Sequence, residues 1–95
     1  MEYEDLRTTL LSKGKATEDR RGHHVFFYVK VDGKEYRATK FSHSARGQIT
    51  ADIFGLIARQ MRLTSRELRE FGECKLTLER WLGFWRERAH SWRAF

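Results

Sequence analysis

The stretch GHHVFFYVKVDGKEYRATKF, residues 22–41, alternates between apolar and polar side chains on both sides of an Asp-Gly pair. Alternation with a period of two is typical of β-strands, and Asp-Gly supplies the two positive-φ residues of a type I′ hairpin turn. The sequence therefore predicts an antiparallel hairpin over about residues 23–41, with its turn at Asp32 and Gly33.

A two-residue turn at these positions fixes which side chains share a face of the hairpin. Val25 then lies opposite Lys40, and His24 lies opposite Phe41. One face holds the more apolar set, which we expect to lie under the helices: Val25, Phe27, Val29, Val31, Tyr36 and Ala38. The other face, here called the open face, is aromatic and basic and is predicted to hold His24, Phe26, Tyr28, Lys30, Glu35, Arg37, Thr39 and Phe41.

Helical patterns precede and follow the hairpin. Residues 2–13 have acidic residues in their first turn and Gly14 after their last, and one helical stripe contains Tyr3, Leu6, Leu10 and Leu11. Residues 15–22 are polar and are predicted to form a short edge strand before the hairpin. Residues 48–62 are predicted to be helical because apolar side chains recur at helical spacing: Ile49, Ile53, Phe54, Ile57 and Met61.

Two further helices are predicted toward the end of the chain. TSRE at residues 64–67 has the form of a capping box and begins a short helix that runs to about Phe71. Thr77 is the expected N-cap of a last helix, whose apolar stripe contains Leu78, Trp81, Leu82, Trp85, Ala89 and Trp92. The predicted fold is α+β: an N-terminal helix, a small antiparallel sheet built on the hairpin, and two or three helices packed on one sheet face.

Length and composition predict one domain over residues 1–95. The chain is 40% hydrophobic and 34% charged, which allows a modest core. Its single cysteine, Cys74, excludes an internal disulfide, and no Cys/His spacing matches a zinc site, so neither a metal nor a cofactor is expected. Met1 leads into acidic residues, and no segment approaches the roughly 18 apolar residues that span a bilayer. We therefore expect a cytoplasmic protein without a membrane segment.

The net charge of +6 is concentrated around the hairpin. Residues 20–48 contain seven Lys/Arg and two Asp/Glu, a surplus of five, whereas residues 1–19 contain three and five. Thirteen of the nineteen basic residues are Arg, whose planar guanidinium binds phosphate in a bidentate manner and stacks on bases. This composition predicts RNA or DNA as a partner, with a basic surface that serves solubility alone as the alternative.

The two adjacent histidines are the first candidates for chemistry. Strand alternation predicts that His24 lies on the open face and that His23 points to the helix side with Val25. A neutral imidazole takes a proton from a ribose 2′-hydroxyl or donates one to a leaving oxygen, while nearby cations stabilise phosphate charge. We therefore rank His24 first and His23 second as catalytic residues, and we expect RNA to be bound by Tyr28, Lys30, Arg37, Lys40, His43 and Arg46. His90 is expected at the surface.

The order of these motifs resembles the HicA family of small toxins over about residues 3–70. A Gly-Ser-His-like motif, an Asp-Gly hairpin and an Ile-Leu-Arg-Gln-type helix end are matched here by Gly22, His23, His24, Asp32, Gly33, Ile57, Arg59, Gln60, Leu63 and Thr64. The resemblance implies a double-stranded-RNA-binding-domain-like fold and metal-independent cleavage of mRNA by the motif histidine. It also implies a HicB-like antitoxin that masks the site, with residues 1–71 as the HicA-like core.

The chain departs from the family pattern in four places. The serine before the motif histidine is missing, the following strand is longer by about two residues, no proline precedes the Ser-His pair at residues 42–43 that replaces a His-containing loop, and residues 72–95 have no counterpart. The family histidine therefore maps to His23 or His24, and strand alternation favours His24. The extension either thickens the core with its tryptophans or forms a surface for homodimerisation or partner docking. Two other functions stay open: a noncatalytic RNA-binding module, and a partner-binding protein whose open face is covered by another chain.

Overall fold

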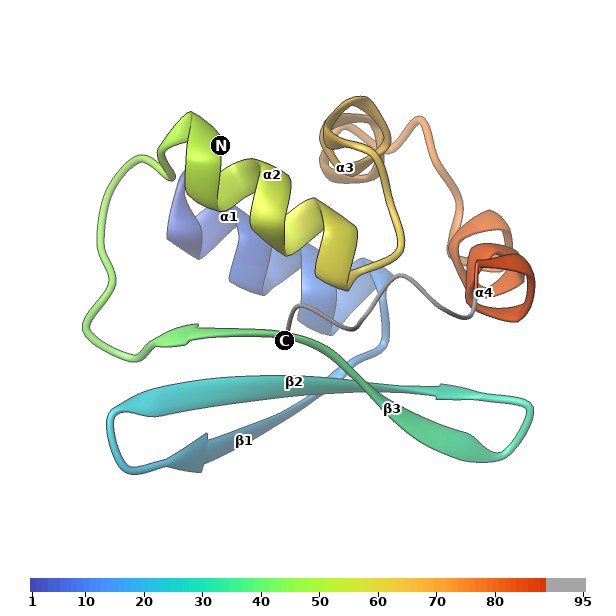
Figure 1. Ribbon diagram of the computed structural model, residues 1–95, viewed down its shortest axis with the longest axis horizontal. Helices are drawn as coiled ribbons and strands as arrows, with labels where there is room; N and C mark the ends of the chain where they lie inside the picture. Colours follow the sequence, from blue (N-terminus) through green and yellow to red (C-terminus); the bar gives the residue numbers. More distant parts are fainter. Residues whose placement is uncertain (89–95) are drawn as a thin grey trace. The chain divides into compact units, whose positions relative to one another are not determined.

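The computed structural model describes residues 1–88, which form an α+β fold with four α-helices and a three-stranded antiparallel sheet (Figure 1). The chain divides into two compact units, Met1–Ile49 and a second unit that begins at Thr50. The first unit contains the N-terminal helix and the sheet, and the second contains the helices that follow. The predicted fold class is confirmed.

The N-terminal helix α1 (Tyr3–Thr8) continues directly into a π-helical turn, η1 (Thr9–Lys13). Leu6 and Leu10 are fully buried, as the predicted apolar stripe requires. The left-handed residue after the helix is Lys15, with φ 53°, rather than the glycine before it. The helical segment therefore ends where the sequence predicts, although the backbone reversal falls one residue later.

The sheet has the strand order β1-β2-β3, with β1 at Thr17–Arg21, β2 at His24–Val31 and β3 at Lys34–Ser42. Both strand pairs are antiparallel. Asp32 and Gly33 join β2 to β3 with φ values of 54° and 81°, which is the pattern of the predicted type I′ turn. The hairpin and its turn are thus confirmed, and β1 confirms the predicted edge strand.

A second tight turn joins β1 to β2 and decides the position of the first histidine. Arg21 pairs with His24, so Gly22 and His23 form the two-residue turn between them, and Gly22 provides a positive φ of 58°. His23 is exposed in this turn and belongs to neither strand. The prediction that the hairpin strand begins at His23 is therefore wrong, because strand pairing and alternation begin one residue later, at His24.

A β-bulge changes the register in the half of the hairpin away from the turn. The pairs from Val31–Lys34 to Tyr28–Arg37 are as predicted, but Phe27 pairs with Thr39, which leaves Ala38 as the extra residue. Beyond the bulge, the register is displaced by one residue. The predicted partners of Val25 and His24 are therefore wrong: they pair with Phe41 and Ser42 respectively.

The bulge moves two residues from the predicted open face to the side of the sheet that carries α1. The Phe41 ring lies 5.1 Å from that of Phe27 and 5.4 Å from that of Tyr3 on α1, measured between ring centroids. Thr39, opposite Phe27, is fully buried. Arg7 of α1 also donates a 2.7 Å hydrogen bond to Glu18 of β1, so α1 is fixed to this face by aromatic and polar contacts.

The second unit contains α2 (Ala51–Gln60), α3 (Ser65–Gly72) and α4 (Leu78–Glu87). The predicted caps are confirmed: Thr64 accepts from the Glu67 N–H at 3.1 Å, and Thr77 accepts from the backbone N–H of the third residue of α4 at 3.2 Å. Within residues 1–88, no helix combines the length and apolar content that crossing a membrane requires.

Two tryptophans of α4 belong to the core of the second unit. Trp81 is fully buried, its Nε1–H donates to the Met61 carbonyl at 2.7 Å, and its ring lies 5.0 Å from that of Phe71. Trp85 is 3% exposed. Ile53 departs from its predicted place in the apolar stripe of α2, because it is 39% exposed. Three other residues of the sequence predictions lie outside the described residues: Ala89, His90 and Trp92.

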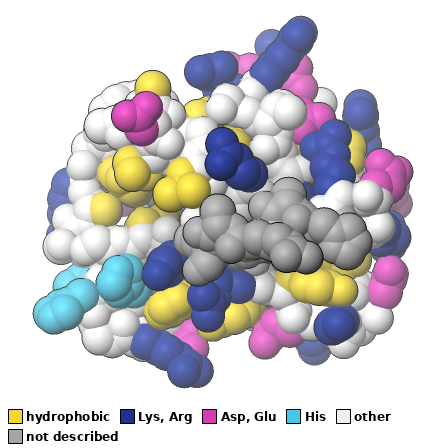
Figure 2. Space-filling model, in the orientation of Figure 1, with side chains coloured by type: hydrophobic (Ala, Val, Ile, Leu, Met, Phe, Trp, Pro, Cys, Tyr) yellow, Lys and Arg dark blue, Asp and Glu magenta, His cyan; other side chains and the backbone are white. Residues whose placement is uncertain are grey.

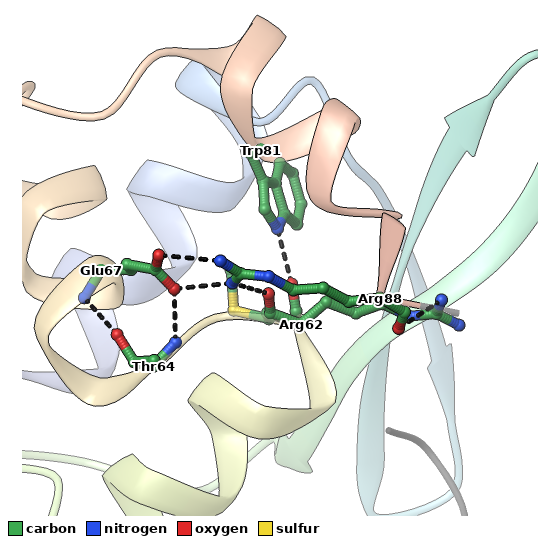
Figure 3. A network of polar contacts seen from close by, with 6 residues as sticks. Arg62, Thr64, Glu67, Trp81 and Arg88 are labelled. Carbon is green, nitrogen blue, oxygen red and sulfur yellow. Dashed lines mark hydrogen bonds and ion pairs between the residues drawn. The ribbon is translucent and has the colours of Figure 1, made fainter. Parts of the chain in front are cut away.

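The turn after α2 is tied to the end of α4 by two arginines (Figure 3). Arg62 donates to the carbonyl oxygens of Trp85 and Arg88, at 3.3 and 3.0 Å. Arg88 donates to the Arg62 carbonyl at 2.8 Å and to both carboxylate oxygens of Glu67. The N-terminal cap of α3 and the last turn of α4 are therefore joined by one polar network.

Candidate nucleic-acid interface and histidine cluster

The open face is the side of the sheet turned away from α1. Its residues follow from the observed register and alternation of the three strands. They are Thr17, Asp19 and Arg21 of β1, His24, Phe26, Tyr28 and Lys30 of β2, and Glu35, Arg37, Lys40 and Ser42 of β3. Four basic side chains and two acidic ones share this surface, so it carries a positive net charge.

Phe26 lies at the centre of the basic part of the open face. The Arg37 guanidinium lies 4.8 Å from the ring centroid of Phe26, and the Lys40 ammonium lies 5.8 Å from it. Such cation–π contacts contribute about 0.5–1 kcal/mol each at exposed sites. The Phe26 ring is half-buried, and the side chains of Arg37 and Lys40 shield part of its surface from solvent.

His24 lies at the start of β2, at the edge of this basic and aromatic cluster. It is exposed, as predicted, and its imidazole centroid lies 6.2 Å from the Phe26 ring. Its neighbour on β1, Arg21, forms a 2.7 Å ion pair with Asp19, and this hydrogen bond raises the pKa of the Arg21 guanidinium. The imidazole is therefore open to solvent beside a row of cations.

The structure brings four of the six predicted RNA-binding residues onto the open face with His24. Tyr28 pairs with Arg37, and Lys30 pairs with Glu35, as the predicted register requires. Lys40 joins them only because of the bulge, which places it opposite Phe26. These neighbours are a phenol, two ammonium groups and a guanidinium, which are groups that bind phosphates and stack on bases.

The other two predicted residues, His43 and Arg46, line a groove on the α1 side of the sheet. This groove, here called the helix-side groove, has a volume of about 790 Å³ and lies among α1, the three strands and the loop after β3. Arg20 of β1 also lines it, as do Tyr3 and Phe41. His43 and Arg46 are thus separated by the sheet from the cations of the open face.

The loop after β3 is held in place by backbone hydrogen bonds. Tyr3 donates its N–H to the Gly47 carbonyl at 3.0 Å, and Ile49 donates to Met1 at 3.1 Å. At the start of the loop, the His43 N–H donates to the His23 carbonyl at 3.0 Å. The loop therefore spans from the β1–β2 turn to the N-terminal residues and forms one wall of the groove.

The same contact places His23 beside His43. Their ring centroids are 6.4 Å apart, and histidine side chains gather at the end of the sheet that carries the β1–β2 turn (Figure 2, cyan). Sequence reasoning did not single out Arg20. The signal was present, because alternation through the edge strand TEDRR puts Glu18 and Arg20 on the face opposite His24.

The described part of the chain contains no group of three or more His, Cys, Asp or Glu side chains placed to hold a metal ion. Cys74 is exposed and has a φ of 67°. No protein-family model, curated protein or solved structure matches this chain. A proposal for its function therefore depends on the open face, the helix-side groove and the histidines between them.

Proposed function

We propose that this protein is a HicA-like ribonuclease that binds mRNA on its open face and cleaves it without a metal. The observation that carries the proposal is the placement of His24, exposed and 6.2 Å from a Phe26 ring that Arg37 and Lys40 also contact. The α+β fold, with an N-terminal helix before a small antiparallel sheet, is compatible with the fold that the HicA resemblance implies, and it supports the same proposal.

The chemistry assigned to this face is an internal phosphoryl transfer. The neutral imidazole of His24 accepts the proton of a ribose 2′-hydroxyl, and the 2′-oxygen attacks the adjacent phosphorus. The bond from phosphorus to the 5′-oxygen breaks, this oxygen takes up a proton from the His24 imidazolium or from water, and a 2′,3′-cyclic phosphate is left on the other fragment. Arg37 and Lys40 stabilise the charge that develops on the phosphate oxygens, and Tyr28 offers a surface for stacking.

Binding of RNA without cleavage is the second candidate function. Among the residues that the structure describes, His24 is the single imidazole on the open face, and general acid–base cleavage usually employs one group for each proton. Phe26 and Tyr28 would then serve as stacking platforms between phosphate-binding cations. A HicB-like partner that covers this face is compatible with both functions.

The His24→Gln variant tests the nuclease. Cleavage of an RNA oligonucleotide is measured in the presence of EDTA, and binding is measured by fluorescence anisotropy with a 2′-deoxy analogue at the cleaved position. We expect the variant to lose at least about 100-fold in cleavage rate while its affinity stays within a factor of two. Equal cleavage by wild type and variant would remove His24 from the mechanism, and binding without cleavage by the wild type would favour the second function.

A further inference from the structure

We propose that the helix-side groove is a separate site for one nucleotide of RNA, which it binds through the phosphate group and the base. The site lies on the opposite side of the sheet from Arg37 and Lys40 and shares no side chain with the open face. The inference therefore goes beyond the proposed cleavage by His24. It is based on a groove, two guanidinium groups, two imidazoles and two aromatic rings.

The size of the groove suits a small polar ligand. Its volume of about 790 Å³ falls within the range of roughly 300–1,000 Å³ that is typical of small-molecule sites. Its walls are fixed: the loop is hydrogen-bonded to Met1 and Tyr3, and α1 is held to β1 by the Arg7–Glu18 ion pair at 2.7 Å. A nucleotide would thus enter a groove whose backbone is already ordered.

Two guanidinium groups of the groove are placed to bind an anion. Arg20 and Arg46 both line it, and within residues 1–88 neither forms an ion pair with a carboxylate. Arg7 differs, because its hydrogen bond with Glu18 raises its pKa and occupies its guanidinium. The planar donors of two arginines suit the oxygens of a phosphate.

The histidine pair lies at the edge of the same groove. His43 lines the groove, and the His23 ring lies 6.4 Å from the His43 ring. Each imidazole reaches a hydrogen-bond partner at about 2.6–3.2 Å, so one phosphate oxygen between the two rings can be contacted by both. The two imidazoles thus offer further hydrogen-bonding nitrogens beside the groove.

The remaining lining residues suit a nucleoside rather than a bare anion. Tyr3 and Phe41 present rings whose centroids are 5.4 Å apart, and the exposed part of such a surface stacks on a base. Glu2 and Glu4 also line the groove, where they repel anions but accept hydrogen bonds from ribose hydroxyls. This combination favours a ligand that carries a phosphate at one end and hydroxyls and a base at the other.

The test is an NMR titration of the isotope-labelled full chain with uridine 3′-monophosphate, inorganic phosphate and uridine. We expect the nucleotide to shift the imidazole signals of His23 and His43 and to bind at least about 10-fold more tightly than phosphate or uridine. The Arg20→Gln/Arg46→Gln double variant should lose at least about 10-fold in affinity. The matched control, Arg66→Gln/Lys75→Gln, removes the same charge from exposed side chains outside both sites and should keep the wild-type affinity.

Two results would overturn the inference. One is equal binding of nucleotide and phosphate, which indicates general attraction of anions by a basic protein. The other is a loss of affinity in Arg66→Gln/Lys75→Gln that matches or exceeds the loss in the groove variant. The proposed nuclease is tested separately. RNA cleavage that depends on His24 can fail while the groove still binds the nucleotide, and cleavage can persist while the groove does not bind it. A ribo-oligonucleotide with a 3′-phosphate that binds more tightly than the mononucleotide would identify RNA as the source of the ligand.

Discussion

The Glu67 carboxylate accepts hydrogen bonds from both terminal nitrogens of Arg88, at 2.7 and 3.1 Å (Figure 3). Glu67 also accepts from the Thr64 N–H at 2.8 Å, so one carboxylate completes the cap of α3 and binds the residue after α4. The hydrogen bond from Arg88 is the main cause that lowers the pKa of Glu67 to about 2. Burial is the next largest effect and opposes this shift, whereas the hydrogen bonds with Thr64 add to it. Folding therefore favours the ionised carboxylate.

We predict that this pair makes stability depend on pH. The folded pKa of Glu67 lies below its ordinary value of 4.5, so its contribution is complete above about pH 5 and is lost as the pH falls toward 2. Glu67→Gln should lower the free energy of unfolding by about 1–2 kcal/mol near pH 7, less than the full shift implies because the side chains are partly exposed. Urea unfolding at several pH values measures the difference, which should shrink in acid.

A neighbouring ion pair on the same helix provides the control. Arg66 and Glu70 of α3 are separated by 3.5 Å at i,i+4 spacing, and the Arg66 side chain is 86% exposed. Exposed pairs of this kind contribute about 0.3–0.5 kcal/mol. Glu70→Gln should therefore change stability little at any pH, and an equal effect of the two substitutions would show that Glu67 has no special role.

Two glycines are predicted to respond in opposite directions to the same substitution. Gly33 has a φ of 81° in the β2–β3 turn, where a side chain is strained, so Gly33→Ala should lower stability by about 1 kcal/mol. Gly83 lies within α4, and a Cβ there would have no heavy atom within 4 Å, so Gly83→Ala should raise stability by about 0.5–1 kcal/mol. Thermal unfolding followed by circular dichroism measures both, and a stabilising Gly33→Ala would contradict the turn geometry.

Local signals in the sequence predicted most of the fold. The Asp-Gly turn, the capping box at Thr64 and the cap at Thr77 each depend on residues within a few positions, and the structure confirms all three. The bulge at Ala38 could not be predicted, because alanine has no preference for such a site and the cause is non-local. It allows Phe41 to pack against rings of β2 and α1 instead of facing solvent.

The candidate site was predicted in part. His24 was placed correctly on the open face, because the alternation of β2 is uninterrupted. Its predicted partner on β3 was wrong, because the bulge displaces β3 by one residue. His23 was wrongly assigned to the strand because a turn beginning at Gly22 was not recognised. The helix-side groove brings together α1, the sheet and a loop, and sequence spacing could not show that His43 and Arg20 line the same groove.

The bulge leads to a third prediction, which compares two phenylalanines of the hairpin. Phe41 contacts the rings of Tyr3 and Phe27 on the α1 side, and Phe27 is fully buried. Phe26 lies on the open face under Arg37. Phe41→Ala should cost about 2–4 kcal/mol of stability and Phe26→Ala about 1 kcal/mol or less. Chemical unfolding distinguishes them, and equally small costs at the two positions would indicate the register without the bulge, in which both rings lie on the open face.

The last prediction concerns the cations of the open face. If Arg37 and Lys40 both contact RNA phosphates, replacing them removes two counterion-releasing contacts. For single-stranded RNA, the slope of log affinity against log salt should then fall in magnitude by about 1.4, at roughly 0.7 for each phosphate contact. The Arg37→Gln/Lys40→Gln double variant, measured by anisotropy over a range of salt concentrations, tests this expectation.

The matched control removes the same charge from the second unit. Arg66 and Lys75 are exposed, with side chains that are 86% and 71% accessible, and both lie outside the sheet. The Arg66→Gln/Lys75→Gln variant has the same net charge as the open-face variant, so general attraction between a basic protein and RNA would weaken equally in both. A lower salt slope in the open-face variant alone indicates direct phosphate contacts, whereas equal slopes in the two variants would place RNA elsewhere on the protein.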